Sequence, residues 1–228
     1  MKRFLAISTS LILVVFGLIP TQTESAIANT QTVTDGNCSA EVNDDTGVVV
    51  REEGNDCIII FSDATLDYRW TIPEGLDSVE VLVVGGGGAG GTDNGGGGGA
   101  GGFVHKTSHD PSDTGNPFVS YTEVPISVGS GGQGVRYSGP SDSDWQDNFM
   151  DGEDSSFGSL TAFGGGGGGH GRDSTPFSER GGRDGGSGGG AAGEEYGPSD
   201  GAVKGTTEDS QQGNDGGEGN PNTQMGAG

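Results

Sequence analysis

Few side chains in this 228-residue chain have the types and spacing that a catalytic or metal site requires. His105 and His109 lie four residues apart, and with His170 they could bind a metal ion, but their polar neighbours are more typical of surface loops. The Asp and Glu residues lie among Gly, Ser and Asn, which suits solvation rather than a desolvated acid–base pair. No Ser or Cys stands in the sequence context of a catalytic nucleophile. We therefore expect no enzyme, no cofactor and no metal centre.

The N-terminus has the pattern of a secretory signal peptide. Met1-Lys2-Arg3 is basic, residues 4–19 are mostly apolar, and Ala26-Ile27-Ala28 is a small-x-small cleavage site. The apolar stretch is short and interrupted by polar residues, whereas a membrane span needs about 20 apolar residues. We predict a signal peptide over 1–28 that is removed, a secreted or cell-surface protein, and no transmembrane anchor.

The two cysteines, Cys38 and Cys57, follow this export signal. In an oxidising compartment an even pair normally forms a disulfide. Between them, Gly54-Asn55-Asp56 separates the β-branched run 48–50 from the apolar run 58–61, as a turn separates the strands of a hairpin. The sequence predicts a disulfide-stapled β-hairpin within an N-terminal segment, 29–63.

The charge balance restricts the partners. With 33 acidic and 10 basic residues, the formal net charge is -23. Phosphate backbones are repelled by such a surface, so we expect no nucleic-acid partner. The acidic residues keep the protein soluble, or alternatively collect divalent cations.

Apolar alternation predicts an all-β protein. Large apolar residues alternate with polar ones over residues 68–72, and Val79–Val84 becomes apolar on both faces. No window after the signal peptide has a 3.6-residue apolar period, so no substantial α-helix is expected. Further strands are predicted over 103–106, 118–128 and 157–163.

The glycine runs could be a nucleotide-binding loop, a calcium-binding repeat, a flexible linker or a packed structure. Gly85, Gly87 and Gly90 form G-x-G-x-x-G after an apolar strand, but the glycines that follow cannot start the helix that this motif needs, so we expect no nucleotide. Calcium-binding repeats require a fixed nine-residue phase, which the two similar segments, 181–185 and 214–217, do not keep. A calcium-binding repeat protein remains a minor alternative.

Packed, extended polyglycine helices fit runs that lie between strands. Such a helix has three residues per turn and no internal hydrogen bonds, so its backbone groups must pair with neighbours. Ordering glycine is costly, and several runs bonded together can offset that cost where one cannot. The glycines assigned to this structure are Gly85, Gly86, Gly87, Gly88, Gly95, Gly96, Gly97, Gly98, Gly99, Gly164, Gly165, Gly166, Gly167, Gly168 and Gly169.

Four blocks, WTIPEGLDSVEVLVVGGGGAGG, ISVGSGGQG, GEDSSFGSLTAFGGGGGG and GGSGGG, occur in an order that resembles the glycine-rich domain of secreted and cell-surface bacterial proteins. The domain is similar to the polyglycine-sandwich tips of phage tail-fibre adhesins and, more remotely, to the glycine-rich ectodomain of anaplastic-lymphoma-kinase-type receptors. The resemblance implies a jelly-roll-like β-sandwich packed with polyglycine-II helices over residues 64–228, truncated at its C-terminal end. We expect a flexible tail after about residue 193.

In the adhesins, loops at the ends of the glycine helices contact the partner. By position, the resemblance assigns this role to three loops, His105–Pro117, Gln133–Gly152 and Gly171–Arg180. The second carries Tyr137, Trp145 and Phe149 among small polar residues, a composition typical of recognition loops. These aromatic residues alternatively cap the β core.

The expected function is non-enzymatic adhesion or recognition of a cell-surface glycan or protein. A purely structural envelope or matrix component is the alternative.

Overall fold

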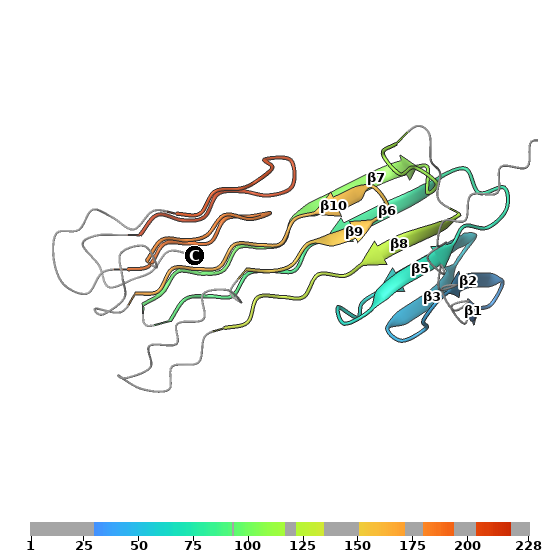
Figure 1. Ribbon diagram of the computed structural model, residues 1–228, viewed down its shortest axis with the longest axis horizontal. Helices are drawn as coiled ribbons and strands as arrows, with labels where there is room; N and C mark the ends of the chain where they lie inside the picture. Colours follow the sequence, from blue (N-terminus) through green and yellow to red (C-terminus); the bar gives the residue numbers. More distant parts are fainter. Residues whose placement is uncertain are drawn as a thin grey trace, which may run out of the picture.

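The computed structural model describes residues 30–92, 94–116, 122–134, 151–171, 180–193 and 204–219. The molecule is elongated, with β-sheets at one end and extended glycine-rich runs at the other (Figure 1). The described residues contain antiparallel sheets and no helix, which confirms the predicted mostly-β fold. Among them, no helix is long and apolar enough to cross a membrane.

The described residues form ten strands in three sheets. The largest has the strand order β1-β2-β5-β8-β9-β10, and the pairs β3-β4 and β6-β7 form two-stranded sheets. The predicted strand Val79–Val84 has the bounds of β6. The strands are β1 Gln31–Asp35, β2 Cys38–Val42, β3 Val48–Glu53, β4 Asp56–Phe61, β5 Asp67–Thr71, β6 Val79–Val84, β7 Phe103–His109, β8 Glu123–Ser127, β9 Ser155–Phe157 and β10 Leu160–Ala162.

The N-terminal segment folds as two hairpins. The predicted hairpin is β3-β4, and its turn contains Gly54 at φ 66°, a value that glycine adopts without strain. The β1-β2 hairpin was not predicted. Its turn places Gly36 at φ 58° between strands rich in polar residues. Inward-facing residues of both hairpins join one core with β5 and β8, whose buried members include Val42, Tyr68, Trp70 and Val124.

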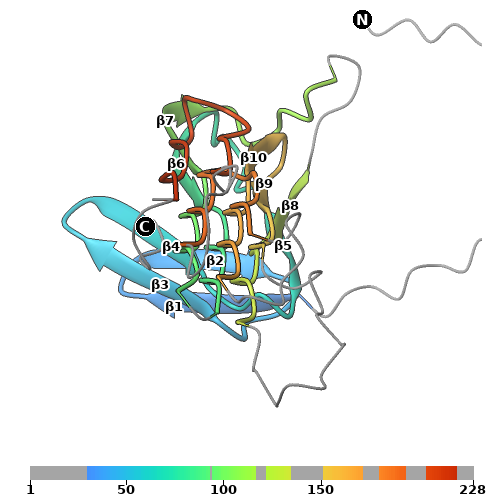
Figure 2. The same ribbon diagram turned by 90° about the vertical axis from the view of Figure 1, so that its left-hand side faces the viewer.

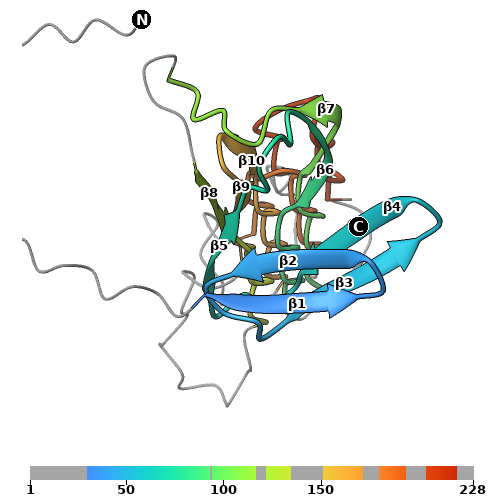
Figure 3. The same cartoon turned by 90° about the vertical axis from the view of Figure 1, so that its right-hand side faces the viewer.

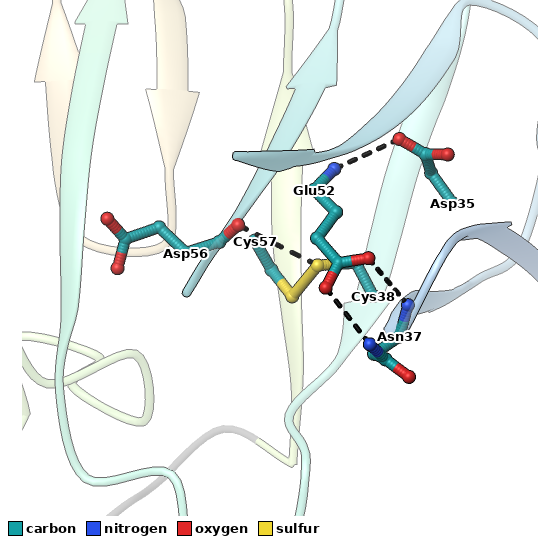
Figure 4. The surroundings of a disulfide bond; sticks show 6 residues. All are labelled: Asp35, Asn37, Cys38, Glu52, Asp56 and Cys57. Carbon is teal, nitrogen blue, oxygen red and sulfur yellow. Dashed lines mark hydrogen bonds between the residues drawn. A yellow bond between two sulfur atoms is a disulfide. The ribbon is translucent and has the colours of Figure 1, made fainter. Parts of the chain in front are cut away.

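The predicted disulfide between Cys38 and Cys57 is present, with a Cα–Cα distance of 5.4 Å (Figure 4). Cys38 begins β2 and Cys57 lies in β4, so the bridge ties the β3-β4 hairpin to β2 rather than closing the hairpin itself. Around it, the Glu52 carboxylate accepts hydrogen bonds from the backbone and side-chain N–H groups of Asn37, both at 3.0 Å. The bridge thus joins two sheets.

The β6-β7 pair covers β9 and β10. Val81 and Val83 pack on Ala162, with Phe157 partly buried against them. The sequence predicted a loop that begins at His105, and this is wrong for residues 105–109. Strand β7 continues to His109, which pairs with Val79 beyond a β-bulge. The polar run 105–109 concealed this strand, because pairing with β6 rather than apolar alternation holds it.

Several strands continue directly into glycine-rich runs. Figure 1 shows β6, β8 and β10 leading into extended segments that lie side by side, and β7 and β9 being entered from such segments. Figure 2 views the molecule from the end that carries these runs, which form a cluster in front of the sheets. Together these runs form what we call the glycine bundle, residues 85–92, 94–102, 128–134, 151–154, 163–171, 180–193 and 204–219.

Candidate functional site

The run 163–171 lies at the centre of the glycine bundle, and residues 164–171 are all buried. The directions of its N–H groups repeat every third residue. Three residues per turn is the repeat of a polyglycine-II helix, which makes no hydrogen bonds within itself. The backbone bonds that show the repeat are Gly165 to Gly86 at 2.8 Å, Gly168 to Ala89 at 2.8 Å, Gly166 to Ser187 at 2.9 Å and Gly169 to Gly190 at 3.0 Å.

The carbonyl groups of the central run follow the same repeat. Every third carbonyl, from Phe163 to Gly169, accepts an N–H group from the run 94–102, which passes in the opposite direction. The backbone groups in these bonds would be orphaned in an isolated helix, and neighbouring runs supply their partners. These bonds are Gly102 to Phe163 at 2.6 Å, Gly99 to Gly166 at 2.7 Å and Gly96 to Gly169 at 2.8 Å.

Two carboxylates take the place of backbone carbonyls on one side of the central run. The N–H of Gly164 donates to Asp154 at 2.7 Å, and the N–H of Gly167 donates to Asp151 at 2.8 Å. The other oxygen of Asp151 forms an ion pair with Arg183 at 2.8 Å. Sequence reasoning assigned no role to these aspartates. Their spacing of three residues, equal to the helical repeat, was the available signal.

Glycine is required in the bundle because the runs approach backbone to backbone. A Cβ built on Gly166 would overlap the carbonyl of Arg183, and one on Gly165 would overlap that of Gly99. On Gly168 it would overlap Gly96. The central run therefore needs glycine because larger residues would not fit between the neighbouring runs. In a flexible linker, glycine would have no such packing role.

The described C-terminal segment also belongs to the bundle. The N–H of Gly188 donates to Asn214 at 2.9 Å, and that of Ala191 to Gly217 at 3.0 Å. Lys204 lies 3.5 Å from Asp215. These contacts hold residues 204–219 on the bundle, whereas the sequence predicted a flexible tail after about residue 193.

Five described residues mark the end of the bundle that is remote from the sheets. The N–H of Gly171 donates to Thr92 at 3.0 Å, and that of Gly193 donates to Asn94 at 2.9 Å. Ala192, next to Gly193, donates to Arg180 at 2.9 Å. Segments far apart in the sequence therefore meet here. We call Thr92, Asn94, Gly171, Arg180 and Gly193 the distal end.

The loop predicted from Gly171 to Arg180 starts and finishes at this distal end, and its residues 172–179 lie outside the described residues. The aromatic candidates Tyr137, Trp145 and Phe149 also lie outside them. Their flanking segments are anchored on the side of the bundle, because Gly132 donates to Gly87 and Gly152 donates to Gly165, both at 2.8 Å. At about 3.1 Å per residue, these anchors lie roughly 15–19 Å before the distal end.

The three histidines lie in different places. His105 is exposed and contacts Glu80 at 2.7 Å, whereas the ring of His109 packs on Phe157. His170 is buried near the distal end, where its Nδ1 lies 3.1 Å from the backbone nitrogen of Thr92. Within the described ranges, no group of three His, Cys, Asp or Glu residues could hold a metal ion.

Local turns and burial in the core explain the shifted pKa values of Asp110, Asp63 and Tyr68. Bonds from the hydroxyl and backbone of Ser112 lower the pKa of Asp110, and the same groups of Thr65 lower the pKa of Asp63. Burial raises the pKa of Tyr68, whose hydroxyl donates to the carbonyl of Thr46 at 2.7 Å. These groups stabilise turns and the core.

Comparison with known proteins agrees with this architecture. A family model described as a glycine-rich domain matches residues 63–228, a range that begins just after β4 and includes the glycine bundle. No curated protein and no solved structure matches the chain. Because the model covers well over half of the sequence, the chain belongs to the glycine-rich domain family.

Proposed function

We propose that this protein is a secreted, non-enzymatic surface protein that recognises a partner through loops displayed on the glycine bundle. One observation carries the proposal: the described residues that flank two of the predicted loops are held in the backbone-packed bundle, on its side and at its distal end. These flanks are Gly132, Gly152, Gly171 and Arg180. The central run of the bundle, 163–171, is nearly all glycine and buried, so it offers few side chains for specific contacts. Specificity therefore belongs to the connecting segments, as in other proteins whose scaffold positions binding loops.

Two further features support a role outside the cell. The Cys38–Cys57 disulfide suits an oxidising compartment. The N-terminal sequence has the pattern of a signal peptide, with predicted cleavage after Ala28. We propose a bacterial envelope or phage-adhesin-like setting, following the resemblance of the glycine-rich blocks, and a cell-surface glycan or protein as partner.

The test is saturable binding. The exported protein would be applied to glycan arrays and to whole cells, beside a variant carrying Trp145→Ala. The matched control is Phe103→Ala, because Phe103 is an aromatic residue on β7 that is 52% exposed. Saturable binding that Trp145→Ala weakens and Phe103→Ala preserves supports recognition. Absence of saturable binding to any array or cell contradicts it and favours the purely structural alternative.

A further inference from the structure

Strand β4 has an open and regular edge. It pairs with β3 over six residue pairs, from Glu53–Asp56 to Val48–Phe61, without a bulge. Within the described residues, no other backbone hydrogen bond reaches its opposite edge. Because antiparallel strands direct backbone N–H and C=O groups to both sides, this edge can accept another strand.

Other strand edges carry features that discourage pairing. The edge strand β1 is mostly polar and ends at Asp35, and β10 has only three residues. A bulge interrupts the pairing of β6 with β7, and β7 also carries Lys106. Lysines, bulges and short edge strands are common protections against pairing between chains. β4, with the sequence DCIIIF, has none of them and contains no proline.

The solvent-facing side of the hairpin is apolar. Ile58 and Ile60 on β4 are 37% and 40% exposed, and Val49, which pairs with Ile60 on β3, is 40% exposed. The opposite face is buried through Val48 and Val50. The turn end of the hairpin projects sideways beyond the other strands (Figure 3), and the disulfide at Cys57 ties β4 to β2. An incoming strand therefore meets a prepared edge.

We propose that β4 pairs antiparallel with β4 of a second copy of this chain, joining two hairpins into one four-stranded sheet. Charge favours this direction. Glu52, Glu53 and Asp56 gather at the turn end of each hairpin, and antiparallel pairing places these acidic ends far apart. If Ile59 pairs with Ile59 of the second copy, Ile58 of one chain faces Ile60 of the other. Such a contact is self-complementary, as a two-fold dimer requires.

The effect of salt concentration distinguishes a second copy of this chain from a basic partner strand. Each chain carries a formal charge of -23, so two copies repel each other at long range. The pairing itself uses backbone hydrogen bonds and apolar side chains, which salt does not screen. Dimer formation is therefore expected to strengthen with ionic strength, whereas binding of a basic strand at the same edge would weaken.

The experiment is sedimentation velocity of the exported protein at increasing concentration, in about 0.05 M and about 0.5 M NaCl, where the screening length differs severalfold. The expected result is a shift from the mass of one chain to twice that mass, at lower protein concentration in high salt. Ile60→Glu should abolish the shift. Leu82→Glu, the same charge change at a 59% exposed residue on β6, should preserve it.

Hydrogen exchange on the unmodified protein gives a second readout that needs no variant. Amides of residues 56–61 should exchange more slowly as the concentration rises, while those of residues 31–35 should not change. A single-chain mass at every concentration and salt overturns the proposal. So does a dimer that survives folded Ile60→Glu, one that Leu82→Glu abolishes equally, or one that salt dissociates.

Discussion

The carboxylate of Asp151 lies 2.8 Å from the backbone nitrogen of Gly167, in the position that a peptide carbonyl occupies beside neighbouring residues of the same run. Gly168, the next residue, donates to the backbone carbonyl of Ala89 at the same distance. A side chain can therefore complete the hydrogen bonding of the bundle where no further run supplies a carbonyl. Asp154 does the same for Gly164.

Removing this acceptor should destabilise the bundle. Asp151→Ala leaves the N–H of buried Gly167 without its acceptor and Arg183 without its ion pair, at an expected cost of about 1–3 kcal/mol in the free energy of unfolding. Asp151→Asn keeps an acceptor oxygen and should cost less. Denaturant unfolding measures both, with Glu74→Ala at an exposed turn as the control. Equal stability of all three variants and the unmodified protein would contradict the assigned role.

The turn at Asp110 predicts a specific change in titration. Its pKa is lowered chiefly by the bond from the Ser112 hydroxyl, at 2.7 Å, and then by the Ser112 backbone. Ser112→Ala should raise the Asp110 pKa toward its ordinary value of 3.8, as measured by carboxyl NMR. Because the folded pKa is depressed, the contribution to stability is complete above the unfolded value and is lost as pH falls through the folded one. An unchanged Asp110 pKa in Ser112→Ala would refute the assignment.

The disulfide should be present in exported protein and should stabilise the N-terminal hairpins. Digestion without reduction, followed by mass spectrometry, should recover linked peptides containing Cys38 and Cys57. The sequence separation of 19 residues corresponds to about 3 kcal/mol in the chain-entropy model, so Cys38→Ser with Cys57→Ser should lower the free energy of unfolding by about that amount. Free, alkylatable thiols in natively exported material would contradict the bridge.

Recognition through the aromatic loop predicts a change in affinity without a change in folding. Truncation of a Trp at an interface hot spot costs at least about 2 kcal/mol, so Trp145→Ala should weaken binding about tenfold or more. The melting temperature should stay close to that of the unmodified protein. If Trp145→Ala instead unfolds the domain, Trp145 caps the core, and the recognition site lies elsewhere.

Side-chain patterns predicted the strands well where apolar residues alternate. Val79–Val84 is identical to β6, and the turn at Gly54 correctly separates β3 from β4. The β1-β2 hairpin was missed because Gln31–Asp35 is largely polar and only Val33 among its residues packs against the core. The C-terminal half of β7 was missed for a similar reason.

The sequence did not predict which glycine runs lie next to each other or in which register they pair. Glycine has no side chain, so its runs carry no pattern that specifies neighbours or register. The sequence therefore suggested packed runs between strands but not that Gly165 pairs with Gly86 or Gly166 with Ser187. The role of Asp151 depends on that register and was not predicted.

The most direct measurement of the central claim, that the glycine bundle is a packed structure, is the stability of Gly166→Val beside Gly134→Val. Gly166 is buried, and even a Cβ there would overlap the Arg183 carbonyl, whereas a Cβ on exposed Gly134 meets no atom within 4 Å. Overpacking costs about 1–3 kcal/mol or more, so Gly166→Val should markedly lower the melting temperature, while Gly134→Val should change it little. An unchanged melting temperature for Gly166→Val would contradict the packed bundle and show that the runs act as flexible linkers.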